Sequence, residues 1–182
     1  MAPKATVYHF VVNVADSDRD FYECLDFRIA QHPSESVRYL LTRVLAYCLV
    51  HEEGIGFSKG GVSSRDEPPL SVVDAQGQLR VWIDVGVPSA ERLHRAAKAA
   101  SRVVVFSSAE PERLRREAAS RSVHRLEEIE VYRVEPELLD ALEPHVRQNT
   151  TWDLTRTEDT LYINVADAAC SGSLLRVSLT PV

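Results

Sequence analysis

The sequence of 182 residues has few cysteines, no long apolar run and no excess of positive charge. Its three cysteines are odd in number and widely spaced (Cys24, Cys48 and Cys170), which argues against a disulfide framework or a zinc site. No apolar stretch approaches the length of a membrane span, and the N-terminus lacks the apolar segment of a signal peptide. We therefore expect a protein of the cytoplasm with reduced thiols and no membrane partner.

The shortage of basic residues limits the partners that the chain can bind. Lysine and arginine number 21 against 27 acidic residues, a formal net charge of −6. Because contacts to phosphates need clustered Lys and Arg, this balance argues against a broad nucleic-acid-binding surface, while a local basic groove and a protein partner stay open. There is no internal repeat and no long linker, so we predict a single domain over residues 1–182.

The first half of the chain predicts a hairpin followed by a long helix. Residues 4–14 and 21–30 are rich in β-branched and aromatic residues, and the segment between them favours a turn. A helix is predicted to begin at 32–34, because apolar residues then recur at helical spacing as far as Leu49. Residues 55–78 read as a loop with a short strand at 55–59.

The second half alternates between strands and helices. A strand at 79–85, a helix at 89–100 and a buried strand at 102–106 form a βαβ unit, which implies parallel pairing. A helix (about 111–120), a strand (about 127–134) and a short helix from Pro136 follow. The last thirty residues read as antiparallel strands that join the N-terminal hairpin in a second sheet or in a roll around the long helix. The fold class is therefore α/β or mixed α+β.

Asp84 is the most unusual residue of the sequence, because it stands in an otherwise apolar strand. A carboxylate there is costly to bury unless it is paired or binds a metal. Strand alternation places Asp84 near the carboxyl end of the strand, where α/β sheets usually carry their sites. If the loop with Asp66 and Glu67 returns to this edge, the carboxylates converge on a site that suits Mg²⁺ or Mn²⁺ rather than zinc.

Further charged residues are candidates for the same site. Glu35 is expected in the first turn of the long helix, where it either complements the helix dipole or supports the acidic pair as an outer ligand or base. The helix after Asp84 carries Arg92, Arg95 and Lys98 on its exposed side. A cation near the start of that helix could stabilise a pentavalent phosphate, although such charges are more often a solvated face.

The order of these residues resembles the core of the PD-(D/E)xK nuclease superfamily, and most closely the bacterial YaeQ family. The resemblance covers nearly the whole chain. It is carried by four blocks, namely Lys4-Ala5-Thr6 with Asn13-Val14-Ala15-Asp16, His32-Pro33-Ser34-Glu35, Asp66-Glu67-Pro68, and Trp82-Ile83-Asp84-Val85-Gly86-Val87-Pro88. It implies a restriction endonuclease-like core, in which a central mixed sheet is flanked by helices, with an added α/β roll. It also implies descent from Mg²⁺-dependent phosphodiesterases.

The chain departs from the superfamily motif at one position. Asp66 or Glu67 takes the place of the first acid and Asp84 that of the second, but the lysine expected two residues later is Gly86. Superfamily members sometimes supply this cation from the following helix, where Arg95 or Lys98 could reach the site. Arginine is a poorer group than lysine for orienting water because it is never neutral.

Two functions are therefore compatible with the sequence. The first is a metal-dependent nuclease in which Asp66, Glu67 and Asp84 hold Mg²⁺ or Mn²⁺, with Glu35 and Arg95 or Lys98 in support. The second is a non-catalytic module that kept a nuclease fold and binds a protein or a nucleic acid. Gly86 and the acidic net charge favour the second function.

Overall fold

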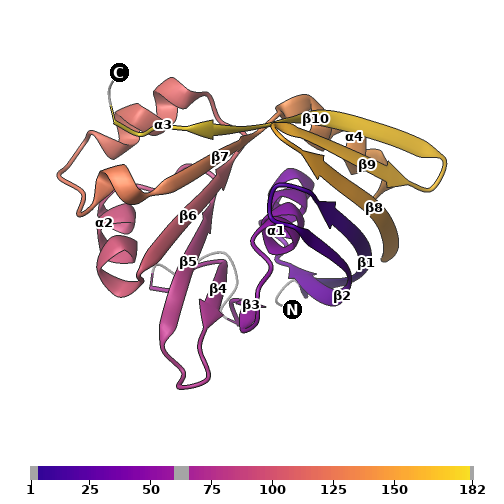
Figure 1. The fold of residues 1–182 in the computed structure, drawn as a ribbon, viewed down its shortest axis with the longest axis horizontal. Helices are drawn as coiled ribbons and strands as arrows, with labels where there is room; N and C mark the ends of the chain where they lie inside the picture. The colour runs from indigo at the N-terminus through magenta and orange to yellow at the C-terminus, as the bar shows by residue number, and fades with distance from the viewer. Residues whose placement is uncertain (1–3, 60–65, 181–182) are drawn as a thin grey trace. The chain divides into compact units, whose positions relative to one another are not determined.

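The computed structural model describes residues 4–59 and 66–180, which form a mixed α+β fold (Figure 1). The chain divides into two compact units. The first consists of Met1–Leu49 and Val134–Leu174, and the second of Val50–Arg133 and Leu175–Val182. The second unit is thus formed mainly by one continuous stretch, which interrupts the sequence of the first.

The first unit is built on a sheet in the order β2-β1-β8-β9-β10. The strands are β1 (Thr6–Asp16), β2 (Phe21–Gln31), β8 (Asn149–Thr157), β9 (Thr160–Val165) and β10 (Ala168–Val177), of which β10 ends in the second unit. β1 and β2 form an antiparallel hairpin, β8 runs parallel to β1, and β9 and β10 continue antiparallel. Alternation along β1 and β8 places Phe10, Val12, Trp152 and Leu154 in the core.

Two helices contribute the rest of this core. α1 (Val37–Leu49) is buried on most sides, and it contacts α4 (Pro136–Leu142), which continues into the 3₁₀ turn η2 (Glu143–His145). Leu40, Leu41 and Leu45 of α1 are fully buried. A helix buried over most of its surface is typical of the centre of a domain, and its buried Arg43 is paired with Glu35.

Gly172 of β10 lies where α4 approaches the sheet most closely. A Cβ added at this position would lie 2.7 Å from the Cβ of Leu138 and 3.0 Å from Oε2 of Glu135. That carboxylate accepts a hydrogen bond from the Ser173 N–H at 2.7 Å, so it holds the start of α4 against the strand. The missing side chain of Gly172 is therefore what permits this close contact.

We predict that Gly172→Ala destabilises the protein by about 1–3 kcal/mol, because the new methyl group overpacks the contact with Leu138. Urea unfolding followed by circular dichroism measures this change. Gly56→Ala is a suitable control, because a Cβ at Gly56 meets no atom within 4 Å. Equal stability of the Gly172→Ala variant and the wild type would show that α4 yields without cost.

The second unit carries a sheet in the order β3-β4-β5-β6-β7. Its elements are β3 (Ile55–Phe57), β4 (Leu70–Val73), β5 (Leu79–Val85), α2 (Ala90–Ala99), β6 (Arg102–Ser107), α3 (Pro111–Ala118), the 3₁₀ turn η1 (Leu126–Glu128) and β7 (Glu130–Val134). β3, β4 and β5 pair antiparallel, whereas β5, β6 and β7 are parallel. The predicted βαβ unit is thus present as β5-α2-β6.

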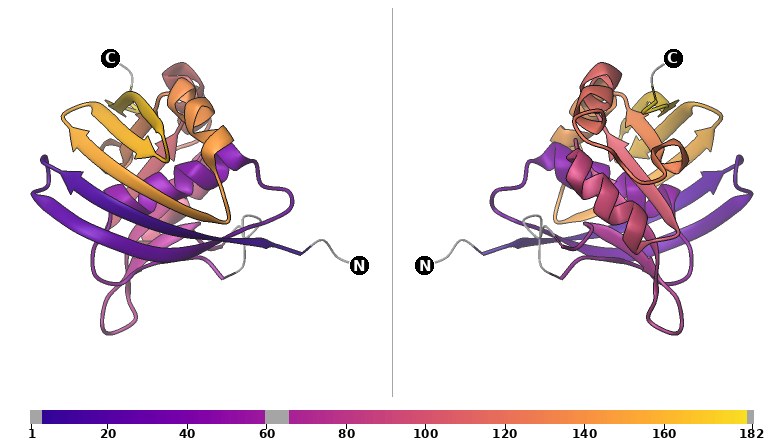
Figure 2. Two further views of the ribbon diagram at one scale, coloured as in Figure 1. Left: turned by 90° about the vertical axis from the view of Figure 1, so that its right-hand side faces the viewer. Right: turned by 90° about the vertical axis from the view of Figure 1, so that its left-hand side faces the viewer.

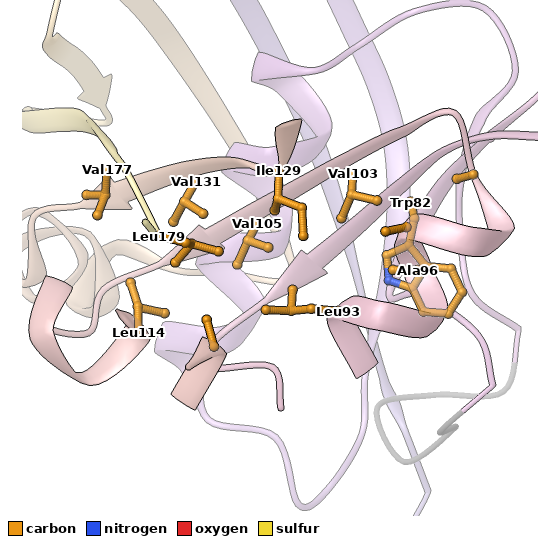
Figure 3. Close-up of a cluster of buried hydrophobic side chains, with 13 residues drawn as sticks. Trp82, Leu93, Ala96, Val103, Val105, Leu114, Ile129, Val131, Val177 and Leu179 are labelled. Carbon is orange, nitrogen blue, oxygen red and sulfur yellow. The ribbon is translucent and has the colours of Figure 1, made fainter. Parts of the chain in front are cut away.

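One face of this sheet packs against α2 and α3 through a buried cluster (Figure 3). Trp82 of β5, Leu93 of α2 and Val105 of β6 belong to it, as do Leu114 of α3 and Leu179 near the C-terminus. Arg125 lies outside the cluster, and its guanidinium donates to the carbonyls of Ala97 and Ala100 at the end of α2. These contacts hold the C-terminal end of α2, at the edge of the sheet opposite to the one that carries Asp84.

Several expectations from the sequence need correction. The long helix begins at Val37 rather than at 32–34, so Glu35 precedes it. The interval 55–78 contains the strand Leu70–Val73 in addition to the short strand Ile55–Phe57, while residues 60–65 of that predicted loop lie outside the described residues. The predicted strand at 127–134 starts only at Glu130, after a 3₁₀ turn.

Two expectations about the strands are confirmed. The N-terminal hairpin forms, and the last strands join it in one sheet through the pairing of β1 with β8. The cysteines are free thiols, and burial raises the pKa of Cys48 far above its usual range. None of the helices in the described part of the chain has the length and apolar character that a membrane crossing requires.

Candidate functional site

Asp84 lies at the carboxyl end of β5, and the structure buries it. Its side chain is only 4% exposed. Oδ2 accepts a hydrogen bond from Nε1 of Trp82 at 3.0 Å and another from Nε of Arg92 at 2.7 Å. The sequence placed Trp82 and Asp84 on one face of the strand, and this hydrogen bond confirms it. The charge of Asp84 is thus compensated by two fixed N–H donors.

Arg92 reaches Asp84 because of how α2 begins. Ser89 is the N-cap, and its hydroxyl accepts a hydrogen bond from the Arg92 N–H, which closes the first turn. The guanidinium of Arg92 then lies over the Trp82 ring, 5.4 Å from its centroid. Arg92 therefore links the first turn of α2 to Trp82 and Asp84 at the carboxyl end of β5.

The loop that carries Asp66 and Glu67 returns to the same helix, which was the condition for its acids to lie near Asp84. Nη2 of Arg92 donates to the Glu67 carbonyl at 3.0 Å, and Nη1 of Arg95 donates to Oδ1 of Asp66 at 2.8 Å. The carboxylate of Glu67 accepts from the hydroxyl of Ser58 at 2.9 Å. Asp66 is 87% exposed, so its contact with Arg95 contributes little to stability.

A surface pocket of about 290 Å³ opens beside these groups, lined by Ser89, Glu91, Arg92 and Arg95. Among the described residues, the two guanidinium groups of the pocket stand against three carboxylates, those of Asp66, Asp84 and Glu91. Arg92 contacts only the backbone carbonyl of Glu67, whose carboxylate is turned to Ser58. The carboxylates therefore outnumber the guanidinium groups, which favours a cation over an anion at this pocket.

The acids supply the oxygen donors that Mg²⁺ prefers, but the structure does not hold them in one cage. Over residues 4–59 and 66–180, no three His, Cys, Asp or Glu side chains are grouped so that they could hold a metal ion. Asp66 and Asp84 are each turned to an arginine and Glu67 to a serine. A metal would fit the chemistry of these donors only after at least one of the exposed carboxylates had left its present partner.

Glu35 lies in the first unit and has partners of its own. Its carboxylate, 1% exposed, pairs with Nη2 of Arg43 at 2.5 Å and accepts from the His32 N–H at 3.0 Å. Burial raises the pKa of Glu35 above its usual value, against the opposing effect of Arg43. The prediction that Glu35 complements the dipole of the helix from its first turn is wrong, because the residue precedes α1 and its charge is matched by Arg43.

The remaining predicted residues are placed as follows. Lys98 is exposed in the last turn of α2 and does not line the pocket. Gly86, the departure from the motif, has φ of +95°, a conformation that strains any residue with a side chain. The group that contacts Asp84 is Arg92, which the sequence placed on a solvated face. Arg92 lies in the first turn of α2, close to the strand end that carries Asp84, and this position was the signal that could have identified it.

Comparison with known proteins places the whole chain in context. The family model described as "YaeQ protein" matches residues 1–173. A relative from Salmonella typhi named "Uncharacterized protein YaeQ" is 36% identical over 107 residues, and one from Escherichia coli K12 with the same name is 34% identical. Each of these matches spans 59% of this chain and 59% of the relative.

Two solved structures are similar in fold. The YaeQ protein from Xanthomonas axonopodis pv. citri superposes with a TM-score of 0.85 at 24% identity, covering 95% of this chain and 98% of that one. The YaeQ protein from Pseudomonas syringae gives a TM-score of 0.83 at 26% identity, covering 94% and 95%. The arrangement of the strands and helices is therefore shared by distant relatives.

Proposed function

The chain belongs to the YaeQ family, and we propose that it is a Mg²⁺- or Mn²⁺-dependent phosphodiesterase that acts on nucleic acid at the pocket beside Asp84. The observation that carries this proposal is the excess of acid around a pocket with two arginines. Such a site favours a cation together with a phosphate, because the cation offsets the carboxylates and the arginines bind the phosphate oxygens.

Each residue has a defined part in this proposal. Asp66, Glu67 and Asp84 would hold the ion, which, when bound, would polarise the phosphate and lower the pKa of an attacking water. Arg95 is 42% exposed and lies on the pocket wall, so it is available to bind a phosphate oxygen once Asp66 turns to the ion. Arg92 keeps Asp84 in place and supplies the positive charge that Gly86 lacks.

The expected result for Asp84→Asn is a loss of about 10²-fold or more in Mg²⁺- or Mn²⁺-dependent cleavage of single-stranded, duplex or branched DNA or RNA. The amide can still accept from Trp82, but it carries no charge for an ion. Asp66→Asn is expected to weaken Mn²⁺ binding in calorimetry. Glu112→Gln is the matched control, because Glu112 is an exposed acid of α3 that does not line the pocket.

A second candidate is a non-catalytic module that binds a protein or nucleic acid through the same surface. Two observations favour it, namely that Asp84 is already satisfied by Trp82 and Arg92, and that no lysine stands at Gly86. This function predicts no cleavage by the wild type with any substrate and any metal. It also predicts that Asp84→Asn binds its partner as the wild type does, whereas Arg95→Ala binds more weakly.

A further inference from the structure

Among the strands in the described part of the chain, β2 is paired on one side only, with β1. It is the terminal strand of its sheet, and all 11 of its residues pair with β1 in a continuous register without a bulge (Figures 1 and 2). In an antiparallel pair, alternate residues turn their N–H and C=O groups away from the neighbouring strand. The carbonyl of Ala30 accepts from Nη2 of Arg43, so the even-numbered residues are the ones with outward backbone groups.

The outer edge of β2 lacks three of the features that usually prevent pairing with another chain, namely proline, lysine and a bulge. Its sequence, Phe21–Gln31, contains no proline and no lysine. Long, regular edges without a bulge or a gatekeeper residue are templates for the addition of a further strand. The outward positions Tyr22, Cys24, Asp26 and Arg28 are exposed, Tyr22 at 59%. A partner strand would therefore find outward backbone groups and accessible side chains from Tyr22 to Arg28, whereas the Ala30 carbonyl already accepts from Arg43.

The sequence of β2 is complementary to itself around Phe27. When a second copy of β2 runs antiparallel with Phe27 opposite Phe27, Asp26 faces Arg28 of the other copy and Arg28 faces its Asp26. Leu25 likewise faces Ile29. The charges thus pair with opposite charges on the exposed face, and the apolar residues pair with apolar residues on the core face. A shift of the register by two residues would place Arg28 opposite itself.

We propose that two copies of this chain associate through β2, antiparallel and centred on Phe27, so that one continuous sheet crosses the two-fold axis. A two-fold interface demands a surface that complements itself about a single point, and the alternation around Phe27 meets this demand. Asp26 and Arg28 stand at hydrogen-bonded positions, so each Asp26–Arg28 pair also exchanges two backbone hydrogen bonds.

The contacts that Asp26 and Arg28 make within a single chain are compatible with this pairing. Among the described residues, Arg28 makes no ion pair, and Asp26, 70% exposed, contacts only the ring of His9, at 2.6 Å. An exposed arginine between apolar neighbours gains a carboxylate from the second copy. Strand addition of this kind takes its affinity from the backbone and its register from the side chains.

Charge reversal tests the proposal by sedimentation equilibrium over a range of protein concentrations. Arg28→Asp and Asp26→Arg each place like charges opposite one another, and each is expected to raise the dimer dissociation constant about tenfold or more. The double variant with both changes restores opposite charges and is expected to dimerise like the wild type. An equimolar mixture of the two single variants is expected to form a heterodimer, because one copy is then basic at both positions and the other acidic.

Asp153→Arg is the matched control, since Asp153 is an exposed acid on the same sheet but on the internal strand β8. Circular dichroism confirms that each variant is folded. A wild type that stays monomeric up to about 100 µM overturns the proposal, as do single variants that dimerise normally. Single variants that the second charge change does not rescue overturn the register. Since the readout is mass alone, these outcomes are separate from any loss of nuclease activity.

Discussion

Replacing Arg43 with methionine is expected to destabilise the protein by about 3–5 kcal/mol. The side chain of Arg43 is 8% exposed, and its guanidinium donates to Glu35 and to the carbonyl of Ala30, both at 2.7 Å. Methionine fills much of the space but leaves the Glu35 carboxylate buried without a counter-charge. Urea unfolding gives the change in free energy, provided that the dependence on urea is unchanged.

The pH dependence of this loss identifies its cause. Burial raises the pKa of Glu35 above the value in the unfolded chain, and the removal of Arg43 raises it further because Arg43 opposes the shift. The folded variant then binds the proton more tightly than the unfolded chain does, so its stability falls as the pH rises above about 4.5. The deficit of Arg43→Met relative to the wild type should be smallest in acid and grow towards neutral pH.

The double variant with Glu35→Gln and Arg43→Met provides the control. With no charge left to bury, it is expected to be more stable at neutral pH than Arg43→Met alone. A deficit of Arg43→Met that is the same at pH 4 and pH 7 would contradict the explanation. It would assign the loss to packing or to the Ala30 carbonyl instead.

Trp82→Ala is the second change with a large expected effect, about 3–5 kcal/mol. The indole is 2% exposed within the core of the second unit and also lies beneath the Arg92 guanidinium. Its removal therefore leaves a cavity against α2. It also deprives Asp84 of one of its two donors.

Trp82→Phe separates these two contributions. Phenylalanine keeps an aromatic ring but has no N–H for Asp84, and it is expected to cost about 1–3 kcal/mol, less than alanine. Nuclease or binding assays on Trp82→Phe then report whether the orientation of Asp84 matters for function. If alanine and phenylalanine cost the same, the ring contributes no packing energy and the hydrogen bond accounts for the whole effect.

Helices and strands with a strong hydrophobic periodicity were predictable from the sequence. Strands that exist only because they pair with other strands were not. The β5-α2-β6 unit follows from alternation, a helical stripe and a buried strand. β4 escaped detection because its four residues, Leu70–Val73, follow the pair Pro68-Pro69 and are a strand only by pairing with β3 and β5. The start of α1 was misjudged because Ser36 rather than Ser34 precedes the helix, and its hydroxyl accepts a hydrogen bond from the Tyr39 N–H of the first turn.

The candidate site was predictable in its position and less so in its contacts. Asp84 was predictable because it is a charge in an otherwise apolar strand. The return of Asp66 to the same edge was only a condition of the prediction, because residues 55–78 were predicted to be a loop. The choice of Arg92 rather than Arg95 or Lys98 as the partner of Asp84 depends on the side-chain path around Trp82. Periodicity cannot show this path, because all three residues lie on the polar side of α2.

The parallel pairing of β1 with β8 has a consequence for how the chain folds during synthesis. Asn13 and Asp153, joined by a 2.8 Å hydrogen bond, are 140 residues apart, and nearly all of the second unit lies between them. The first hairpin is therefore synthesised early, and both of its edges stay unpaired until β8 has been made, about 150 residues into the chain. Contacts so distant in sequence slow folding and expose edges to aggregation. In this chain, the hairpin with unpaired edges is the folding intermediate that a chaperone would have to protect.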